Sequence, residues 1–138
     1  MPSKRRGKRS GKSGQPKGSK SSTTTRRRGW GSATKTTYEG VLYDSKSEAA
    51  YAAHLDRLLD AGEIAKWDRQ VKVRLEIGGK LICSIVPDFL VWDLRNKATY
   101  VEVKGFATPV WRLKRKIFEA LFPDAAYVVI TSKEALAL

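Results

Sequence analysis

The spacing of apolar residues predicts a helix early in the chain. Over residues 45–61 they recur every three or four positions, which is typical of a helix with one buried face. Ser45 is a suitable N-cap, and Gly62 follows the expected end. The positions of this buried stripe are Tyr51, Ala52, Leu55, Leu58 and Leu59.

Strands are predicted where apolar residues alternate with polar ones or form short runs. Val71, Val73, Leu75 and Ile77 would share one face of a half-buried strand, and the next strand is mostly apolar but interrupted at Pro87-Asp88. Two glycines at 78–79 favour a hairpin turn between these two strands. The four predicted strands cover residues 71–77, 81–92, 99–104 and 127–131.

A second helix is predicted from Pro109 to about Leu121, because Thr108 can cap it and Pro123 follows its end. The order of elements is then α-β-β-β-α-β. This order predicts an α/β fold, a mixed sheet flanked by helices. The apolar stripe expected on the second helix is Val110, Leu113, Ile117 and Leu121.

The distribution of charge divides the chain into two parts. The formal net charge is +13, but residues 1–36 hold 12 basic residues and no acidic one, whereas residues 37–138 hold 15 basic and 14 acidic. Residues 1–29 also lack large apolar side chains apart from Met1, so we expect them to be a disordered arm. The chain is therefore interpreted as a basic arm, 1–36, and one domain, 37–138, which excludes a two-domain enzyme.

A polycationic tether suits a polyphosphate backbone, and DNA is the predicted partner of the arm. An anionic membrane is less suitable, because the arm lacks interleaved aromatic or leucine anchors. A solubility tail and a nuclear-localisation-like segment are the other interpretations. The arm residues expected to contact phosphates are Lys4, Arg5, Arg6, Lys8, Arg9, Arg26, Arg27 and Arg28.

Residue types that are scarce limit the chemistry. The chain has one cysteine, Cys83, and one histidine, His54, so it cannot form an internal disulfide or assemble a zinc cluster. Any metal would be held by oxygen ligands, which favours Mg²⁺ or Mn²⁺. No small-molecule cofactor is expected. No apolar run approaches 18 residues and no secretory signal is evident, so we expect no membrane partner and a cytoplasmic location.

Two acids and a lysine could meet on adjacent strands. Glu102 and Lys104 are two residues apart and would share one face of the strand 99–104. Asp88 lies in the preceding apolar strand, and the polar turn at 93–97 would let the two strands form a hairpin. Two neighbouring carboxylates repel unless a proton or a divalent cation lies between them. The alternatives are an ordinary turn acid at Asp88 and a solvated ion pair of Glu102 with Lys104.

The segment Val86-Pro87-Asp88, followed after thirteen residues by Glu102-Val103-Lys104, resembles the PD-(D/E)xK nuclease superfamily. Gln70 and Gly105 also fit that pattern. The arrangement is most similar to a small phage-encoded family related to TnsA-type transposase endonucleases and phage junction-resolving endonucleases. The resemblance implies a restriction-endonuclease-like αβββαβ core. It also implies a metal site formed by Glu48, Asp88, Glu102 and the main-chain carbonyl of Val103.

Glu48 has two interpretations. Ser45-x-x-Glu48 is a capping box, in which the glutamate would bond back to the Ser45 amide. Glu48 also lies on the same stripe as Tyr51 and Leu55, so its carboxylate would face the sheet. Together with the resemblance, this placement favours a role at the metal site.

The second helix contains four cations within five residues. Most charged helix faces are merely solvated, but residues 37–138 outside this run have more acids than bases. We therefore expect a surface that follows phosphates, with Gln70 near it. The helix residues assigned to DNA binding are Arg112, Lys114, Arg115 and Lys116.

These observations predict a Mg²⁺-dependent DNA endonuclease with Glu48, Asp88, Glu102 and Lys104 as catalytic residues. Lys104 would orient the attacking water or stabilise the developing negative charge. We expect a homodimer that is selective for branched DNA such as a Holliday junction, in phage DNA metabolism. The alternatives are a TnsA-like strand-cleaving subunit that needs partner proteins, a catalytically silent nucleic-acid-binding module, and an RNA- or ribosome-associated protein.

Overall fold

The structure is a computed structural model, and it describes residues 33–138. The predictions for the arm, from Lys4 to Arg28, lie outside the described residues. The helices are α1 (Lys46–Asp60), α2 (Pro109–Leu121) and α3 (Ser132–Ala137). The strands are β1 (Thr36–Tyr38), β2 (Val41–Tyr43), β3 (Lys66–Arg69), β4 (Val73–Ile77), β5 (Lys80–Ile85), β6 (Phe89–Trp92), β7 (Ala98–Lys104) and β8 (Ala126–Thr131).

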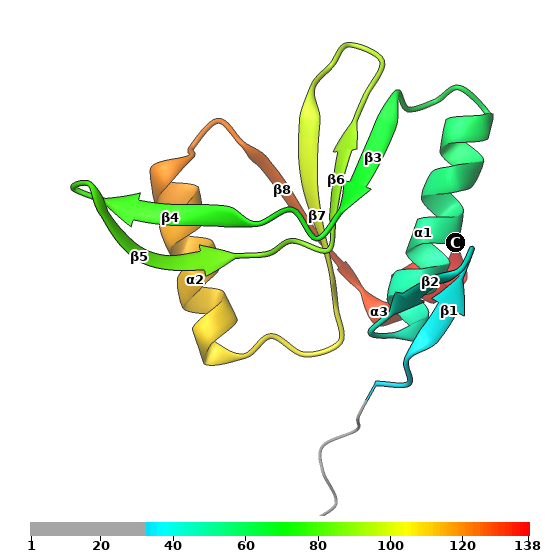
Figure 1. The fold of residues 1–138 in the computed structure, drawn as a ribbon, viewed down its shortest axis with the longest axis horizontal. Helices are drawn as coiled ribbons and strands as arrows, with labels where there is room; N and C mark the ends of the chain where they lie inside the picture. Colours follow the sequence, from blue (N-terminus) through cyan, green and yellow to red (C-terminus); the bar gives the residue numbers. More distant parts are fainter. Residues whose placement is uncertain (1–32) are drawn as a thin grey trace, which may run out of the picture. The chain divides into compact units, whose positions relative to one another are not determined.

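The main sheet has the strand order β3-β6-β7-β8 (Figure 1). Strand β6 is antiparallel to both of its neighbours, β3 and β7, whereas β8 is parallel to β7. A parallel neighbour requires a crossover, and α2 provides it between β7 and β8. The predicted α/β fold, a mixed sheet flanked by helices, is therefore confirmed.

The predicted strand 81–92 is wrong as a single element. It is divided into β5 and β6, which belong to different sheets, and the break falls at Pro87. Proline has no N–H to donate to a strand ladder, so pairing stops there. Strand β5 pairs with β4 in a separate hairpin, whose turn residues Gly78 and Gly79 both have positive φ. The glycine turn was thus predicted correctly.

One face of the main sheet packs against α1 and α3. Val101 and Val103 of β7 and Phe89 of β6 form a buried cluster with Tyr51 and Leu55 of α1. Most of the stripe predicted for α1 is therefore confirmed, but Leu59 is 40% exposed. Ser45 caps this helix by accepting a hydrogen bond from the Glu48 N–H.

The opposite face packs against α2 and the β4–β5 hairpin. Phe118 of α2 forms a second cluster with Leu75 and Ile85 of the hairpin, and Tyr100 and Tyr127 of the sheet pack against it. Figure 1 shows α2 beside this hairpin, with α1 and α3 across the sheet from it.

The stripe predicted for α2 is wrong in its first half. Val110 and Leu113 are 63% and 59% exposed, and Phe118 is the residue that is buried. The helix is therefore rotated relative to the expectation, so that Trp111, which was not in the predicted stripe, is partly buried. Three short strands, β1, β2 and β3, and the six-residue helix α3 were not predicted. Within residues 33–138, the helices are all too short or too polar to cross a membrane.

Candidate active site

Strand β7 places Glu102 and Lys104 side by side. Glu102 is only 3% exposed, and the Nζ atom of Lys104 lies 2.6 Å from its Oε1 atom. The hydroxyl of Tyr127, on the parallel neighbour β8, donates a hydrogen bond of 3.2 Å to Oε2 of the same carboxylate. Since both oxygens of Glu102 have a partner, this carboxylate is buried without being left unpaired.

Asp88 lies just before β6, in the segment that joins the two sheets. Phe89 pairs with Val101, so continuing this antiparallel register by one residue sets Asp88 opposite Glu102. The main-chain N–H of Val103 donates a hydrogen bond of 2.7 Å to Oδ2 of Asp88. A hydrogen bond from the backbone of β7 therefore holds Asp88 against the strand that bears Glu102.

The electrostatic environment of Asp88 is unfavourable for its charge. Burial, and then the negative charge of Glu102, raise the pKa of Asp88 from the ordinary 3.8 to about 7. The hydrogen bond from Val103 acts in the opposite direction but does not compensate. Burial and the nearby Glu102 also raise the pKa of Tyr127, so its hydroxyl stays protonated and able to donate at neutral pH.

Glu48 approaches the two acids from the first turn of α1. Its carboxylate is half-buried, and the Ser45 hydroxyl donates a 3.0 Å hydrogen bond to its Oε1 atom. Burial raises the pKa of Glu48, and the negative charge of Glu102 adds to this increase. The carboxylate is held by the Ser45 hydroxyl rather than by the Ser45 amide, so the reciprocal capping box is not formed.

Three carboxylates thus influence one another electrostatically, and their oxygens are the donors that Mg²⁺ and Mn²⁺ prefer. As the side chains stand in the described part of the chain, no three His, Cys, Asp or Glu groups are close enough to hold a metal ion. Lys104 provides the positive charge next to Glu102 in this arrangement. The chemistry of the donor set fits a hard divalent cation, because two acids with raised pKa values would gain from a positive charge between them.

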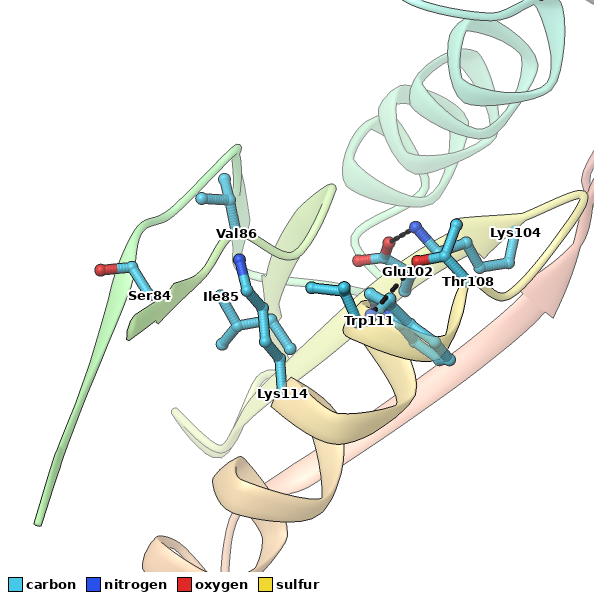
Figure 2. Close-up of a pocket in the computed structure, with 9 residues that line it drawn as sticks. Ser84, Ile85, Val86, Glu102, Lys104, Thr108, Trp111 and Lys114 are labelled. Carbon is cyan, nitrogen blue, oxygen red and sulfur yellow. Dashed lines mark hydrogen bonds and ion pairs between the residues drawn. The ribbon is translucent and has the colours of Figure 1, made fainter. Parts of the chain in front are cut away.

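A pocket of about 270 Å³ opens beside the Glu102–Lys104 pair (Figure 2). It lies between the first turns of α2 and the end of β5, where Ile85 and the following residue, Val86, line it. Figure 2 shows Trp111 and Lys114 of α2 reaching into this region from the helix. The Nζ atom of Lys104 lies 5.1 Å from the centroid of the Trp111 ring, within the range of a cation–π contact.

The structure separates the residues that were assigned to DNA binding. Lys114 lines the pocket, whereas Arg112 and Lys116 are exposed on α2 away from it. Arg115 is turned toward the Trp111 and Tyr127 rings and forms an ion pair of 2.8 Å with Glu119. Gln70 is exposed and lies beside the acids, because its N–H donates to the main-chain oxygen of Asp88 at 2.9 Å.

Two residues of the site were not found in the sequence analysis. Tyr127 was only part of a predicted strand, and nothing local indicates that its hydroxyl reaches Glu102 across the parallel pair β7–β8. Trp111 lay outside the expected stripe of α2, yet it contacts Lys104 and lines the pocket. The aromatic residues at 111, 118 and 122 recur at the spacing of a helix, and this recurrence was the available signal for the face that α2 buries.

Comparison with known families gives one match. The model of the DUF1064 family, described as a protein of unknown function, matches residues 29–135. A search of curated proteins and a search of solved structures gave no match. The matched range includes α1, β6, β7, α2 and β8. It therefore includes every described residue of the site.

Proposed function

The chain belongs to the DUF1064 family, and we propose that it is a metal-dependent endonuclease that hydrolyses phosphodiester bonds in DNA. The observation that supports this proposal is the proximity of Asp88, Glu102 and Lys104 where the start of β6 lies beside the end of β7. A partly buried acid with a raised pKa, such as Asp88, is typical of functional sites, and its neighbour Glu102 lines a pocket. A purely structural ion pair would not need a second, poorly compensated carboxylate next to it.

The ion in this proposal is Mg²⁺ or Mn²⁺, held by Asp88, Glu102 and the Val103 carbonyl, with Glu48 contributing. When bound, it would supply Lewis-acid activation of the phosphodiester and of the attacking water. The assignment draws support from the bond between Asp88 and Val103 and from the Glu102–Lys104 ion pair. The proposal includes the restriction-endonuclease-like core that the sequence motif resembles. In the proposed correspondence α1, β4, β7, α2 and β8 each match one core element, and β5 and β6 together match the second strand of the αβββαβ order.

The residues of the chain have separate tasks in the proposed reaction. Lys104 would move from Glu102 to the reacting phosphate and stabilise the negative charge that develops on its oxygens. Tyr127 would hold Glu102 in place while Lys104 is engaged, because it bonds the other carboxylate oxygen. The Val103 N–H would fix the direction of Asp88.

DNA is the proposed substrate because the chain combines a near-neutral domain with 12 cations in residues 1–36. We propose that it acts as a homodimer on branched DNA, since a domain of this size has little room for a separate base-reading module. A TnsA-like subunit that depends on partner proteins is the second candidate, because the sequence motif also resembles that group. The two differ in whether the purified protein cleaves alone.

The test is to incubate the full chain with supercoiled plasmid, linear duplex and a four-way junction, with Mg²⁺ and with EDTA. We expect Mg²⁺-dependent cleavage, with the junction cut faster than the duplex of equal length. Asp88→Ala, Glu102→Ala and Lys104→Ala should abolish cleavage and leave binding in EDTA nearly unchanged. Asp68→Ala, at an exposed position of β3, and Lys97→Ala, in the exposed turn, are the matched controls.

Each outcome has a defined meaning. Wild-type turnover in any of the three site variants would refute the assignment of the site. Binding of all three DNAs with no cleavage and no Mn²⁺ binding by calorimetry would indicate the silent module instead. Mn²⁺ binding without cleavage would point to the TnsA-like subunit, whose activity needs a partner.

A further inference from the structure

The pocket beside the acids has two chemically different ends. Figure 2 shows Glu102, Lys104 and Thr108 at one end and Ile85 and Val86 at the other, and Val110 is a further apolar residue of the lining. In Figure 2, Ser84, Val86 and Lys114 are on the side away from Glu102 and Lys104. The pocket therefore extends beyond what a divalent cation and one phosphate would occupy.

Two of the apolar residues that line the pocket are exposed to solvent. Val86 is 46% exposed and Val110 is 63% exposed, although both line a concave surface. Apolar side chains gathered in a pocket with a few polar groups are typical of a binding site. A phosphate or a metal ion gains nothing from such walls, so the expected occupant has a flat apolar part.

The polar groups of the pocket fit an anionic ligand. Lys104 and Lys114 both line it, and the Trp111 ring adds an aromatic surface between them. An aromatic surface next to cations is the arrangement with which proteins bind nucleotides of single-stranded DNA. The volume of about 270 Å³ is slightly below the range of about 300–1,000 Å³ found for drug-sized ligands, so it suits one nucleotide.

We propose that this pocket receives one unpaired nucleotide adjacent to the phosphate that is cleaved. Its base would lie against Val86, Val110 and Trp111, and Lys114 would contact its phosphate. This inference rests on the proposed nuclease function and deepens it, because it names the substrate class. An intact duplex keeps every base stacked and paired, so the preferred DNA has a nucleotide that is already free.

The test compares the binding of three fluorescein-labelled DNAs in EDTA, where no cleavage occurs. One is a perfect duplex, one has a single-nucleotide bulge, and one has the same bulge with an abasic nucleotide. We expect the full chain to bind the bulge about tenfold more tightly than the duplex, and the abasic bulge to lose most of that preference. Equal affinity for the bulges with and without the base would overturn the proposal.

Matched variants place the effect in this pocket. Val110→Glu and Leu113→Glu change the charge equally, on the same helix and at similarly exposed positions, but only Val110 lines the pocket. We expect Val110→Glu to remove the preference for the base and Leu113→Glu to retain it. Lys114→Gln should weaken binding to the bulge by about fivefold more than Lys116→Gln does, since Lys116 is outside the pocket. Equal effects within either pair would reject the pocket.

Failure of this inference is distinguishable from failure of the nuclease proposal. Mg²⁺-dependent cleavage of the same DNAs with no dependence of binding on the base would leave the nuclease and reject the pocket. Binding that depends on the base, without cleavage by the purified protein, would retain a nucleotide pocket and reject a self-sufficient nuclease.

Discussion

The main-chain N–H of Val103 donates a 2.7 Å hydrogen bond to Oδ2 of Asp88. This bond joins Val103, which lies between Glu102 and Lys104 on β7, to the acid that immediately precedes β6. The carboxylate of Asp88 is thereby aimed by the backbone rather than by a flexible side chain. An acid fixed in this way stays close to Glu102 even though the two charges repel.

The first prediction concerns pH and stability. The pKa of Asp88 is about 7 in the folded chain and 3.8 ordinarily, so the folded state binds more protons than the unfolded state between these values. Without divalent cations, the free energy of unfolding should therefore fall as pH rises from about 4 to about 7. A shift of about three units corresponds to a loss of up to about 4 kcal/mol from this group.

Asp88→Asn isolates that contribution, because an amide oxygen can still accept the Val103 bond and cannot ionise. In urea denaturation with EDTA, this variant should be more stable than the wild type at pH 8, and the difference should shrink toward pH 4. Asp68→Asn, at an exposed site on β3, is the control and should follow the wild-type curve. If the free energy of unfolding had the same pH dependence in the wild type and in Asp88→Asn, the raised pKa of Asp88 would be contradicted.

The second prediction concerns divalent cations. If the acids hold Mg²⁺ or Mn²⁺, the ion binds the folded chain only, and it should raise Tm at pH 7.5 by roughly 5 °C at saturating concentration. At pH 5 protons compete for Asp88, so the increase should be smaller. Glu102→Gln should remove the increase, and Asp68→Asn should keep it. An equal increase in all of these proteins would indicate nonspecific binding.

The third prediction concerns the ion pair on β7. Lys104→Met leaves a carboxylate that is 3% exposed without its cation, which should cost about 3 kcal/mol of stability at neutral pH. The double variant Lys104→Met/Glu102→Gln should recover most of this loss, because no buried charge remains. Lys97→Met, in an exposed turn, should change stability by less than about 0.5 kcal/mol. If the losses of stability in the two single variants added up in the double variant, Lys104 and Glu102 would not interact.

The fourth prediction concerns residues 1–29. Their deletion should weaken DNA binding and reduce the slope of log affinity against log salt concentration, because the released counterions are fewer. The measurement is fluorescence anisotropy of one duplex between about 50 and 200 mM salt. An unchanged slope would show that this segment does not contact the phosphate backbone. Substitution of its arginines by lysines should preserve the slope and serves as the control for charge alone.

The central part of the site follows directly from sequence. Side chains alternate along a strand, so Glu102 and Lys104 had to share a face of β7, and the structure places them in contact. The polar turn at 93–97 made β6 and β7 neighbours, which brings Asp88 level with Glu102. These relationships depend only on local geometry, and local geometry can be predicted from a single chain.

The remaining features depend on contacts between distant segments. Strand β3 has one apolar residue, Trp67, among three charged ones, and it becomes a strand because the edge of β6 is available to it. The face that α2 buries could not be chosen from its own sequence, because Val110 and Phe118 lie on different faces of the helix and both are apolar. The aromatic rings of Tyr100 and Tyr127 on the sheet decide between them by packing on Phe118.

Pro87, which is fully buried, joins the hairpin of β4 and β5 to the main sheet immediately before Asp88. The pyrrolidine ring restricts rotation in the segment that connects β5 of the hairpin to β6 of the main sheet. A change in the tilt of the hairpin would consequently change the orientation of the Asp88 side chain. Mutations in the core of the hairpin, such as those at Leu75, would therefore change the orientation of Asp88 without any direct contact with it.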